Sequence, residues 1–399
     1  MKPPGKLFCH PERSERLPAS AGPVFRAVVS ILLVASVIAR LPVAAQSLPQ
    51  SLPTKLDDST FWRLVNDYSE QGGFFRSDNF VSNETSFQYV IPGLKQRTRP
   101  GGVYLGVGPE QNFTYIVALQ PKIAFIFDIR RQNMLTHLMY KAVIEQATDR
   151  ADFLSRLFSR ARPAKLDSTS TVDALFTAFT IASQDTVAYR KNLNSIKDRL
   201  TKHHGFTLSD DDLKTIEYVF SAFYMAGPDL TYNFAQGSGF RGGRMPSYAD
   251  VMTSTDEAGQ KRSYLATESN FRALKRLEAD NAIVPLVGDF AGPKAIRTVG
   301  QFVREHGATI TAFYTSNVEQ YLFQQDEDWR RFFSNVATLP LDSTSVFIRA
   351  VFNGMGMLRY PGPVGPRSET LVASIDEQVR AFAAGTLASY YDVIQTSKP

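Results

Sequence analysis

The chain has 399 residues, of which 43% are hydrophobic and 21% charged, enough to bury the core of one large domain or of two or three smaller ones. Its net charge of +5 comes mostly from residues 1–45, because the remainder holds 38 basic and 37 acidic residues. This balance argues against a nucleic-acid partner. The single cysteine, Cys9, excludes disulfides and thiolate metal sites from the remainder.

Residues 24–45 have the pattern of a secretory signal peptide. Arg26 precedes an uncharged apolar run, and small residues follow that would place cleavage before Gln46. The run is shorter than the ~20 apolar residues that span a bilayer. An uncleaved anchor, the alternative, would be the protein's link to a membrane. Residues 1–23 resemble peptides translated from bacterial intergenic repeats. A genuine leader predicts a periplasmic or secreted protein, and its absence a cytoplasmic one.

A Pro- and Ser-rich linker, 46–56, precedes the predicted domain, 57–399. Its first helix is expected over 57–69, where four apolar side chains share one face: Phe61, Leu64, Val65 and Tyr68. A shaped loop and a second short helix are expected to follow, within 74–94.

The segment 101–133 predicts the fold. It reads as a strand at 103–105, a tight turn, a helix at 113–119 and a second strand at 123–129. Apolar strands separated by a short helix indicate a parallel sheet covered on both faces. We therefore expect a Rossmann-like α/β domain with a mostly parallel sheet.

The pattern is mostly helical from about 133 to 280, which predicts a large helical insertion. The α/β pattern then resumes. Its expected elements are a strand ending at Asp289, a helix at 293–306, a strand from 308 leading into a turn and helix, a strand at 343–352 and a final helix at about 369–391.

The turn after the first strand is a candidate ligand site. Gly106 and Gly108 let the backbone approach a ligand closely, and Asp128 ends the next strand 22 residues after Gly106. An acid at this distance can accept both ribose hydroxyls. Gln111 replaces the third glycine of a dinucleotide motif, and Pro109 lacks an N–H, so a ligand without phosphates is favoured. The alternative is an ordinary tight turn.

Further polar residues crowd this turn and the strand end after it. Glu110, Gln111 and Asn112 are candidate ligand contacts, although Asn112 could instead cap the helix. Arg130 or Arg131 could grip a ligand carboxylate, or one of them could pair with Asp128.

Two later strand ends carry more candidates. Asp289 and Phe290 could hold an adenine, with Asp289 as cap of the next helix as the alternative. The strand after 308 is followed by polar residues that could contact substrate or lie in a solvated loop: Tyr314, Ser316, Asn317, Glu319 and Tyr321. No histidine has convincing metal-ligand spacing, so no metal is expected.

Four blocks, GVYLGVGPEQNFTYI, FIFDIRRQN, GDFAGPKAI and AFYTSNVEQYLF, resemble an uncharacterised bacterial family related to class I S-adenosylmethionine-dependent methyltransferases. The resemblance implies that Gly106 and Gly108 form the glycine motif, that Asp128 binds ribose and that Asp289 lies beside adenine. The sequence departs from the pattern at Gln111, and it lacks an Asn-Pro-Pro-Tyr-type motif after the fourth strand.

These observations predict an S-adenosylmethionine-binding, methyltransferase-like protein with a small-molecule ligand; they do not indicate the methyl acceptor. The expected cofactor contacts are Gly106, Gly108, Glu110, Gln111, Asn112, Asp128, Arg130, Asp289 and Phe290. Glu110, Tyr314 or Glu319 would assist proton removal, and Ser316, Asn317 and Tyr321 would contact substrate. An exported, non-catalytic binding protein is the alternative, because S-adenosylmethionine is kept in the cytoplasm. A nicotinamide-dependent oxidoreductase is disfavoured by Gln111.

Overall fold

The computed structural model describes residues 51–234, 245–352 and 368–398. The predicted leader, 1–45, and the first part of the predicted linker lie outside these residues. The chain divides into Met1–Ser47 and Leu48–Pro399, and every described residue belongs to the second unit. Within the described residues, no helix is long and apolar enough to cross a membrane.

A six-stranded sheet forms the centre of the described unit, with the strand order β3-β2-β1-β4-β5-β6. All neighbouring strands are parallel except β5 and β6, which are antiparallel. This mostly parallel sheet confirms the predicted Rossmann-like α/β fold. The strands are β1 (Val103–Val107), β2 (Ile123–Asp128), β3 (Ile283–Val287), β4 (Ile310–Ser316), β5 (Val346–Phe352) and β6 (Ser368–Ser374).

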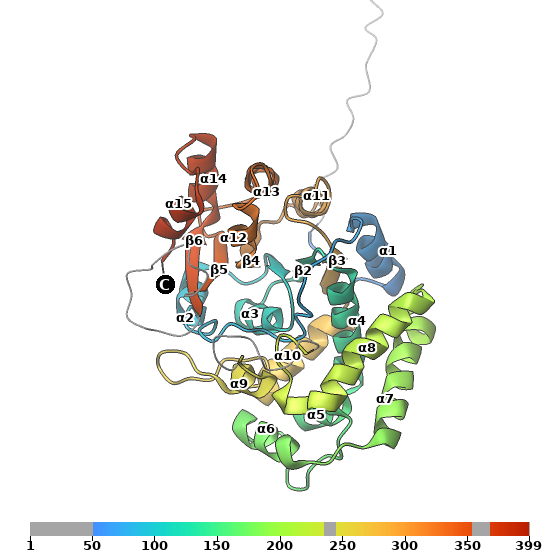
Figure 1. Ribbon diagram of the computed structural model, residues 1–399. Coiled ribbons are helices and arrows are strands. Elements are labelled where there is room, and N and C mark those ends of the chain that lie inside the picture. Colours follow the sequence, from blue (N-terminus) through green and yellow to red (C-terminus); the bar gives the residue numbers. More distant parts are fainter. Residues whose placement is uncertain (1–50, 235–244, 353–367, 399) are drawn as a thin grey trace, which may run out of the picture. The chain divides into compact units, whose positions relative to one another are not determined.

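Helices cover both faces of the sheet. The strands β1, β2 and β3 are therefore buried along their whole length. Figure 1 shows one group of helices on one face: α1 (Asp58–Tyr68), α11 (Ala295–Glu305), α13 (Asp328–Val336) and α14 (Ile375–Ala383). The opposite face carries α2 (Ile91–Arg97), α3 (Gln111–Leu119), α4 (Arg131–Gln146) and α10 (Glu268–Ala279). Two short helices, α12 (Val318–Leu322) and α15 (Tyr390–Gln395), follow β4 and α14.

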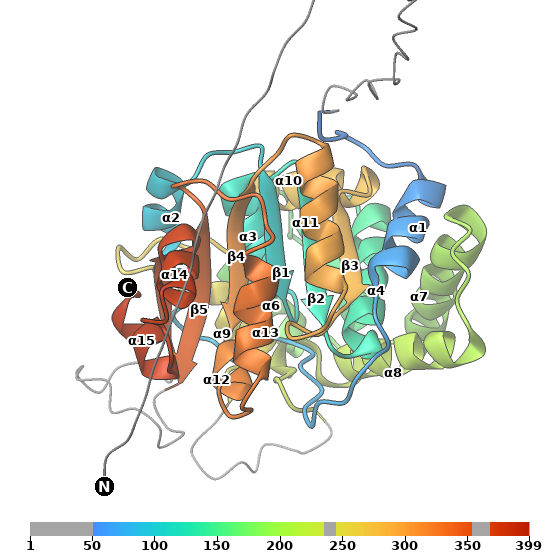
Figure 2. The same ribbon diagram turned by 90° about the horizontal axis from the view of Figure 1, so that it is seen from above.

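All named secondary-structure elements between β2 and β3, in the described residues, are helices or helical turns. Besides α4 and α10 they are α5 (Arg150–Phe158), α6 (Val172–Ile181), α7 (Thr186–Asp198), the π-helical turn η1 (Arg199–His203), α8 (Asp210–Ala226), the 3-10 turn η2 (Gly227–Asp229) and α9 (Tyr248–Thr253). Figure 2 shows α7 and α8 beyond the β3 edge of the sheet.

The strand order creates a switch point beside β1. The chain passes from β1 to β2 and then to β3 on one side, and it returns to place β4 on the other side of β1. The crossovers therefore diverge between β1 and β4, and such a crevice at the carboxyl ends of the strands is where open α/β sheets bind ligands.

The predicted helix over 369–391 is wrong in its first part. Ser368–Ser374 is the strand β6, which pairs with β5 from Phe352↔Ser368 to Val346↔Ser374. The sequence SETLVAS has β-branched residues that suit an edge strand, and its pairing partner is not visible in local periodicity. The helix starts only at Ile375, where the Ser374 side chain accepts a hydrogen bond from the Glu377 N–H.

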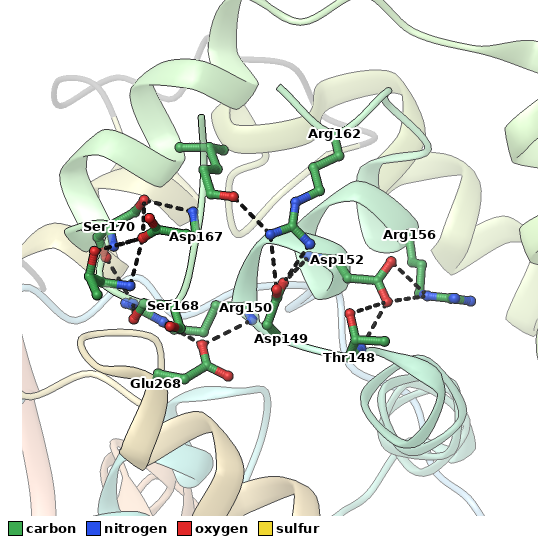
Figure 3. A network of polar contacts seen from close by, with 12 residues as sticks. Thr148, Asp149, Arg150, Asp152, Arg156, Arg162, Asp167, Ser168, Ser170 and Glu268 are labelled. Atoms are coloured by element: carbon green, nitrogen blue, oxygen red, sulfur yellow. Dashed lines mark hydrogen bonds and ion pairs between the residues drawn. The ribbon is translucent and has the colours of Figure 1, made fainter. Parts of the chain in front are cut away.

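Arg150 connects three segments of the chain between β2 and β3. Its side chain is 3% exposed and forms an ion pair with Glu268. It also donates to the carbonyl oxygens of Leu265 and Ala266, and to those of Ser168 and Ser170. Figure 3 shows this side chain reaching Ser168, Ser170 and Glu268 from the start of α5.

Replacing Arg150 by methionine should lower the free energy of unfolding by about 2–3 kcal/mol, because buried carbonyl groups would lose a charged donor. Arg156→Met is the matched control. Arg156 lies in the same helix, and its ion pair with Asp152 is partly exposed, 32% and 21%; we expect a loss of at most about 1 kcal/mol there. Chemical denaturation measures both, and equal losses would contradict this role of Arg150.

Candidate functional site

A pocket of about 390 Å³ lies at the switch point. Its floor is formed by residues at the carboxyl ends of four neighbouring strands, among them Gly108, Asp128, Asp289 and Tyr314. Residues 74–84, the covering loop, supply six further lining residues: Phe74, Phe75, Asn79, Ser82, Asn83 and Glu84. This volume is in the range of small-molecule sites.

The two glycines of the first turn have different roles. Gly108 has a φ of +76°, a conformation that favours glycine, and a Cβ added there would meet open space. Gly108 lines the pocket, so its backbone faces the space for a ligand. A Cβ on Gly106 would instead collide with Oδ1 of Asn112, so Gly106 makes room for a side chain of the protein.

The buried side chain of Asn112 holds this turn by hydrogen bonds to its backbone. Its amide donates to the carbonyl oxygens of Val107 and Pro109 at 2.9 and 2.7 Å, and its Oδ1 accepts from the Tyr104 hydroxyl. Asn112 is fully buried and is not a lining residue of the pocket. Since α3 has no side-chain cap hydrogen bond, Asn112 is not the helix cap either.

Glu110 and Gln111 are also buried beneath the pocket and do not line it. The Glu110 carboxylate accepts from the backbone N–H of Ser82, and its Oε2 has no partner among the described residues. Burial raises the pKa of Glu110 to about 8. The Gln111 amide donates to Glu84 at 2.7 Å. Both residues support the covering loop, so the structure does not bring them to a ligand.

Asp128 lines the pocket, and Arg130 holds both of its carboxylate oxygens. The Arg130 Nε donates to Oδ1 at 3.0 Å and its Nη2 to Oδ2 at 2.9 Å. The same guanidinium donates to the carbonyl oxygens of Ser77 and Asp78, which fastens the covering loop. Arg130 therefore orients Asp128 and does not itself line the pocket. Arg131 pairs with Asp212 instead.

Asp289 and Phe290 both line the pocket on the β3 side. Asp289 accepts from the N–H of Ala291, and burial raises its pKa. Phe290 is 3% exposed and stacks on Phe332 at 5.3 Å, so most of the ring belongs to the core. Only part of Phe290 is available to a ligand.

Glu70 caps α11 from outside the helix. Its carboxylate accepts from the N–H groups of Lys294 and Ala295, both at 2.7 Å, and from that of Asp289 at 3.1 Å. Asp289 is therefore not the cap of this helix. This contact has no local signal in the sequence, because Glu70 and Ala295 are 225 residues apart.

Glu84 is the main site residue that the sequence analysis missed. It lines the pocket, is 1% exposed, and accepts at Oε1 from the hydroxyls of Tyr314 and Ser316, both at 2.6 Å. Burial raises the pKa of Glu84. It lies in the Asn- and Ser-rich stretch SDNFVSNE, whose composition alone indicates only a loop.

The end of β4 is bent at these residues. Ser316 has a φ of 49°, in the left-handed region, and the pairing of β4 with β5 shifts register between Tyr314 and Ser316. Such strained conformations persist where the surrounding structure enforces them, often at functional sites. The bend brings the Ser316 hydroxyl to Glu84.

Asn317 and Tyr321, which are predicted to contact substrate, also line the pocket. Tyr321 meets Phe75 of the covering loop edge-on, with ring centroids 5.5 Å apart. Glu319 is directed away from the pocket and forms an ion pair with Arg349 in which both side chains are 1% exposed. It is not placed to remove a proton from a ligand.

Asp58, His203 and His204 are the one group among the described residues with metal-ligand proximity. However, both ring nitrogens of His204 hydrogen bond to carboxylates, Nδ1 to Asp58 and Nε2 to Glu145, each at 2.8 Å. A metal ion would have to displace one of these bonds. The geometry is that of a buried polar network between α1 and α4.

The fold and the pocket together define a Rossmann-like protein with a ligand pocket at its switch point. The model of the family described as "Domain of unknown function (DUF7790)" matches residues 79–219 and 228–384, and the chain belongs to that family. No curated protein matches the chain. Among solved structures, the chain is similar to the rRNA methyltransferase aviRa from Streptomyces viridochromogenes, with 11% identity over 79% of this chain and 98% of that chain and a TM-score of 0.29.

Proposed function

We propose that the pocket binds S-adenosylmethionine and that the protein is a methyltransferase-like enzyme acting on a small molecule. The observation that carries this proposal is that Gly108, Asp128 and Asp289 line one pocket at the switch point. They are three residues that the sequence resemblance assigns to the glycine motif, the ribose and the adenine. The family is described as one of unknown function, so the proposal depends on the geometry.

The charge of the pocket supports a cationic nucleoside. Four carboxyl side chains line it, and no lysine, arginine or histidine is among the described lining residues: Glu84, Asp128, Asp289 and Asp328 are the acids. Arg130 and Arg331 pair with Asp128 and Asp328 from outside the lining, so the acidic character of the pocket rests mainly on Glu84 and Asp289. Like charges 4 Å apart repel by about 4 kcal/mol at an effective dielectric constant near 20. A pyrophosphate is therefore disfavoured, whereas the sulfonium and ammonium groups of S-adenosylmethionine are attracted.

In this arrangement Asp128 accepts one ribose hydroxyl. Arg130 donates to Oδ1 through its Nε and its backbone N–H and to Oδ2 through Nη2, so one of about four acceptor positions remains, on Oδ2. Asp289 accepts from the adenine amino group beside the exposed part of Phe290. Catalysis would come mainly from holding an acceptor atom against the methyl group. Tyr314 and Glu84 line the pocket and could assist proton removal from an acceptor, whereas Glu110 and Glu319 do not line it.

A second candidate function is ligand binding without catalysis, in an exported protein. The observation that favours it is the hold of Arg130 on both oxygens of Asp128, which makes this acid a weaker partner for a ribose. A mature N-terminus at Gln46 in a periplasmic fraction, together with no methyl transfer, would support this candidate over the first.

Calorimetric titration tests S-adenosylmethionine binding. We expect heat of binding with S-adenosylmethionine and S-adenosylhomocysteine and none with NAD. Asp289→Ala should weaken binding about 10-fold or more, the effect of losing a hydrogen bond to a charged group. The control, Asp67→Ala, changes an exposed acid of α1 outside the pocket and should leave affinity unchanged. Absence of binding to the folded wild-type protein would contradict the proposal.

A further inference from the structure

The pocket has two halves, separated by β1. The half on the side of β2 and β3 contains Asp128 and Asp289, to which the nucleoside is assigned above. The half on the side of β4 contains Tyr314, Ser316 and, hydrogen bonded to both, Glu84. This second half is not needed for the nucleoside contacts, and its chemistry is different.

Glu84 is a buried carboxylate without a counter-ion among its hydrogen-bond partners. The three side chains that donate to it, Gln111, Tyr314 and Ser316, are all neutral. They use two acceptor positions on Oε1 and one on Oε2, which leaves a position on Oε2 for one more donor. An ionised carboxylate removed from water is costly unless a cation or further donors compensate it.

Aromatic rings line the pocket as a whole. Six of them line the pocket: Phe74, Phe75, Tyr232, Phe290, Tyr314 and Tyr321. Rings attract cations through their negative faces, by about 0.5–2 kcal/mol each where the cation is desolvated. Phe74 is 87% exposed, a large apolar side chain at the pocket that a ligand would cover. Aromatic rings combined with a carboxylate are typical of sites for organic cations.

We propose that the β4 side of the pocket binds an organic amine in its ammonium form, with Glu84 as counter-ion and Tyr321 as an aromatic contact. The assignment of this amine as the methyl acceptor rests on the proposed function. For transfer the ammonium would first give a proton to Glu84, and the nitrogen lone pair would then form the bond to the methyl carbon as the S–C bond breaks, releasing S-adenosylhomocysteine. The amine site itself does not, because it follows from the carboxylate, its neutral donors and the rings. Ser316, with its left-handed backbone, would orient the Glu84 carboxylate in this site, because its hydroxyl donates to Oε1 of Glu84.

Burial raises the pKa of Glu84, and a bound ammonium group would favour the ionised carboxylate. Binding of an amine near or below neutral pH should therefore release protons. Calorimetry in two buffers of different ionisation enthalpy measures this release. A ligand that bound through its apolar part alone would release none.

The test compares benzylamine with benzyl alcohol, a neutral molecule of nearly the same shape, on the full-length protein. Benzylamine should bind at least 10-fold more tightly, and Glu84→Gln should remove most of this preference. Tyr321→Leu, which leaves Glu84 in place, should weaken benzylamine about 5-fold or more. Glu327→Gln is the control, because Glu327 is 63% exposed and does not line the pocket.

The outcomes separate this inference from the proposed function. Benzylamine binding in a protein that does not bind S-adenosylmethionine would support the amine site and leave the methyl-acceptor assignment without basis. Equal affinities for benzylamine and benzyl alcohol would overturn the amine site, even if S-adenosylmethionine bound. Unchanged benzylamine affinity in both folded variants, Glu84→Gln and Tyr321→Leu, would also overturn it.

Discussion

Replacing Arg349 by methionine should lower the free energy of unfolding by about 3–5 kcal/mol, the usual effect of leaving a buried charge without its partner. Arg349 lies in β5, and its guanidinium donates to both oxygens of Glu319 at 2.7 and 3.0 Å. It also donates to Gln378 of α14 and to Ser397 near the end of the chain. Its removal would leave the Glu319 carboxylate buried against Thr315 alone.

The double variant Arg349→Met, Glu319→Gln should recover a large part of the loss, because the glutamine carries no charge. Arg380→Met is the matched control: Arg380 pairs with Asp376, but the two side chains are 70% and 39% exposed. We expect a change of at most about 1 kcal/mol there. Urea denaturation at neutral pH measures all three. If the double variant were no more stable than Arg349→Met, the unpaired carboxylate would not be the cause.

The sequence alone could not exclude Glu319 from the site, because its ion-pair partner is distant in the chain. Glu319 follows β4 closely, as Tyr314, Ser316 and Tyr321 do, and strand ends are where ligand contacts gather. The difference between them is orientation: the short helix α12 turns Glu319 towards β5, while Asn317 and Tyr321 line the pocket. Its partner Arg349 is 30 residues away in the sequence.

The β1–α3–β2 part of the fold could be predicted because its signals are local. Val103–Val107 and Ile123–Asp128 are buried throughout and contain no charged residue before Asp128, which is the pattern of strands covered on both faces, and the glycine turn lies between them. The positions of Gly108, Asp128 and Asp289 at one edge follow from the rule that parallel strands share their carboxyl ends. Sequence was sufficient for residues at the carboxyl ends of these parallel strands.

Residues on the connecting loops could not be placed in the same way. Glu84 meets Tyr314 across 230 residues, and Glu70 meets Ala295 across 225. Neither acid lies in a periodic pattern, and the loop around Glu84 reads as polar and irregular. Likewise, β6 depends on pairing with β5, and its own seven residues do not distinguish strand from helix. Contacts set by tertiary packing carry no local signal.

Glu110→Gln should make the protein more stable than wild type at alkaline pH. Glu110 is fully buried, and its folded-state pKa of about 8 lies above the ordinary value of 4.5 because burial disfavours the charged form. A raised acid pKa means that the folded protein binds the proton more tightly than the unfolded chain does. Stability from Glu110 is therefore complete below pH ~4.5, falls as the pH rises to about 8, and stays low above it.

The size of the effect follows from the pKa difference, at ~1.4 kcal/mol per unit, and amounts to about 5 kcal/mol above pH 8. Glutamine keeps the oxygen that accepts from the Ser82 N–H and cannot ionise. The free energies of unfolding of the two proteins, from urea denaturation at each pH, should be similar at pH 4–5 and differ at pH 8–9.

Glu278, whose pKa burial also raises to about 8, affects the stability of both proteins equally and does not change their difference. Glu257→Gln, at an exposed position, should show no such divergence. A variant less stable than wild type at every pH would mean that Glu110 is ionised and paired in the folded protein.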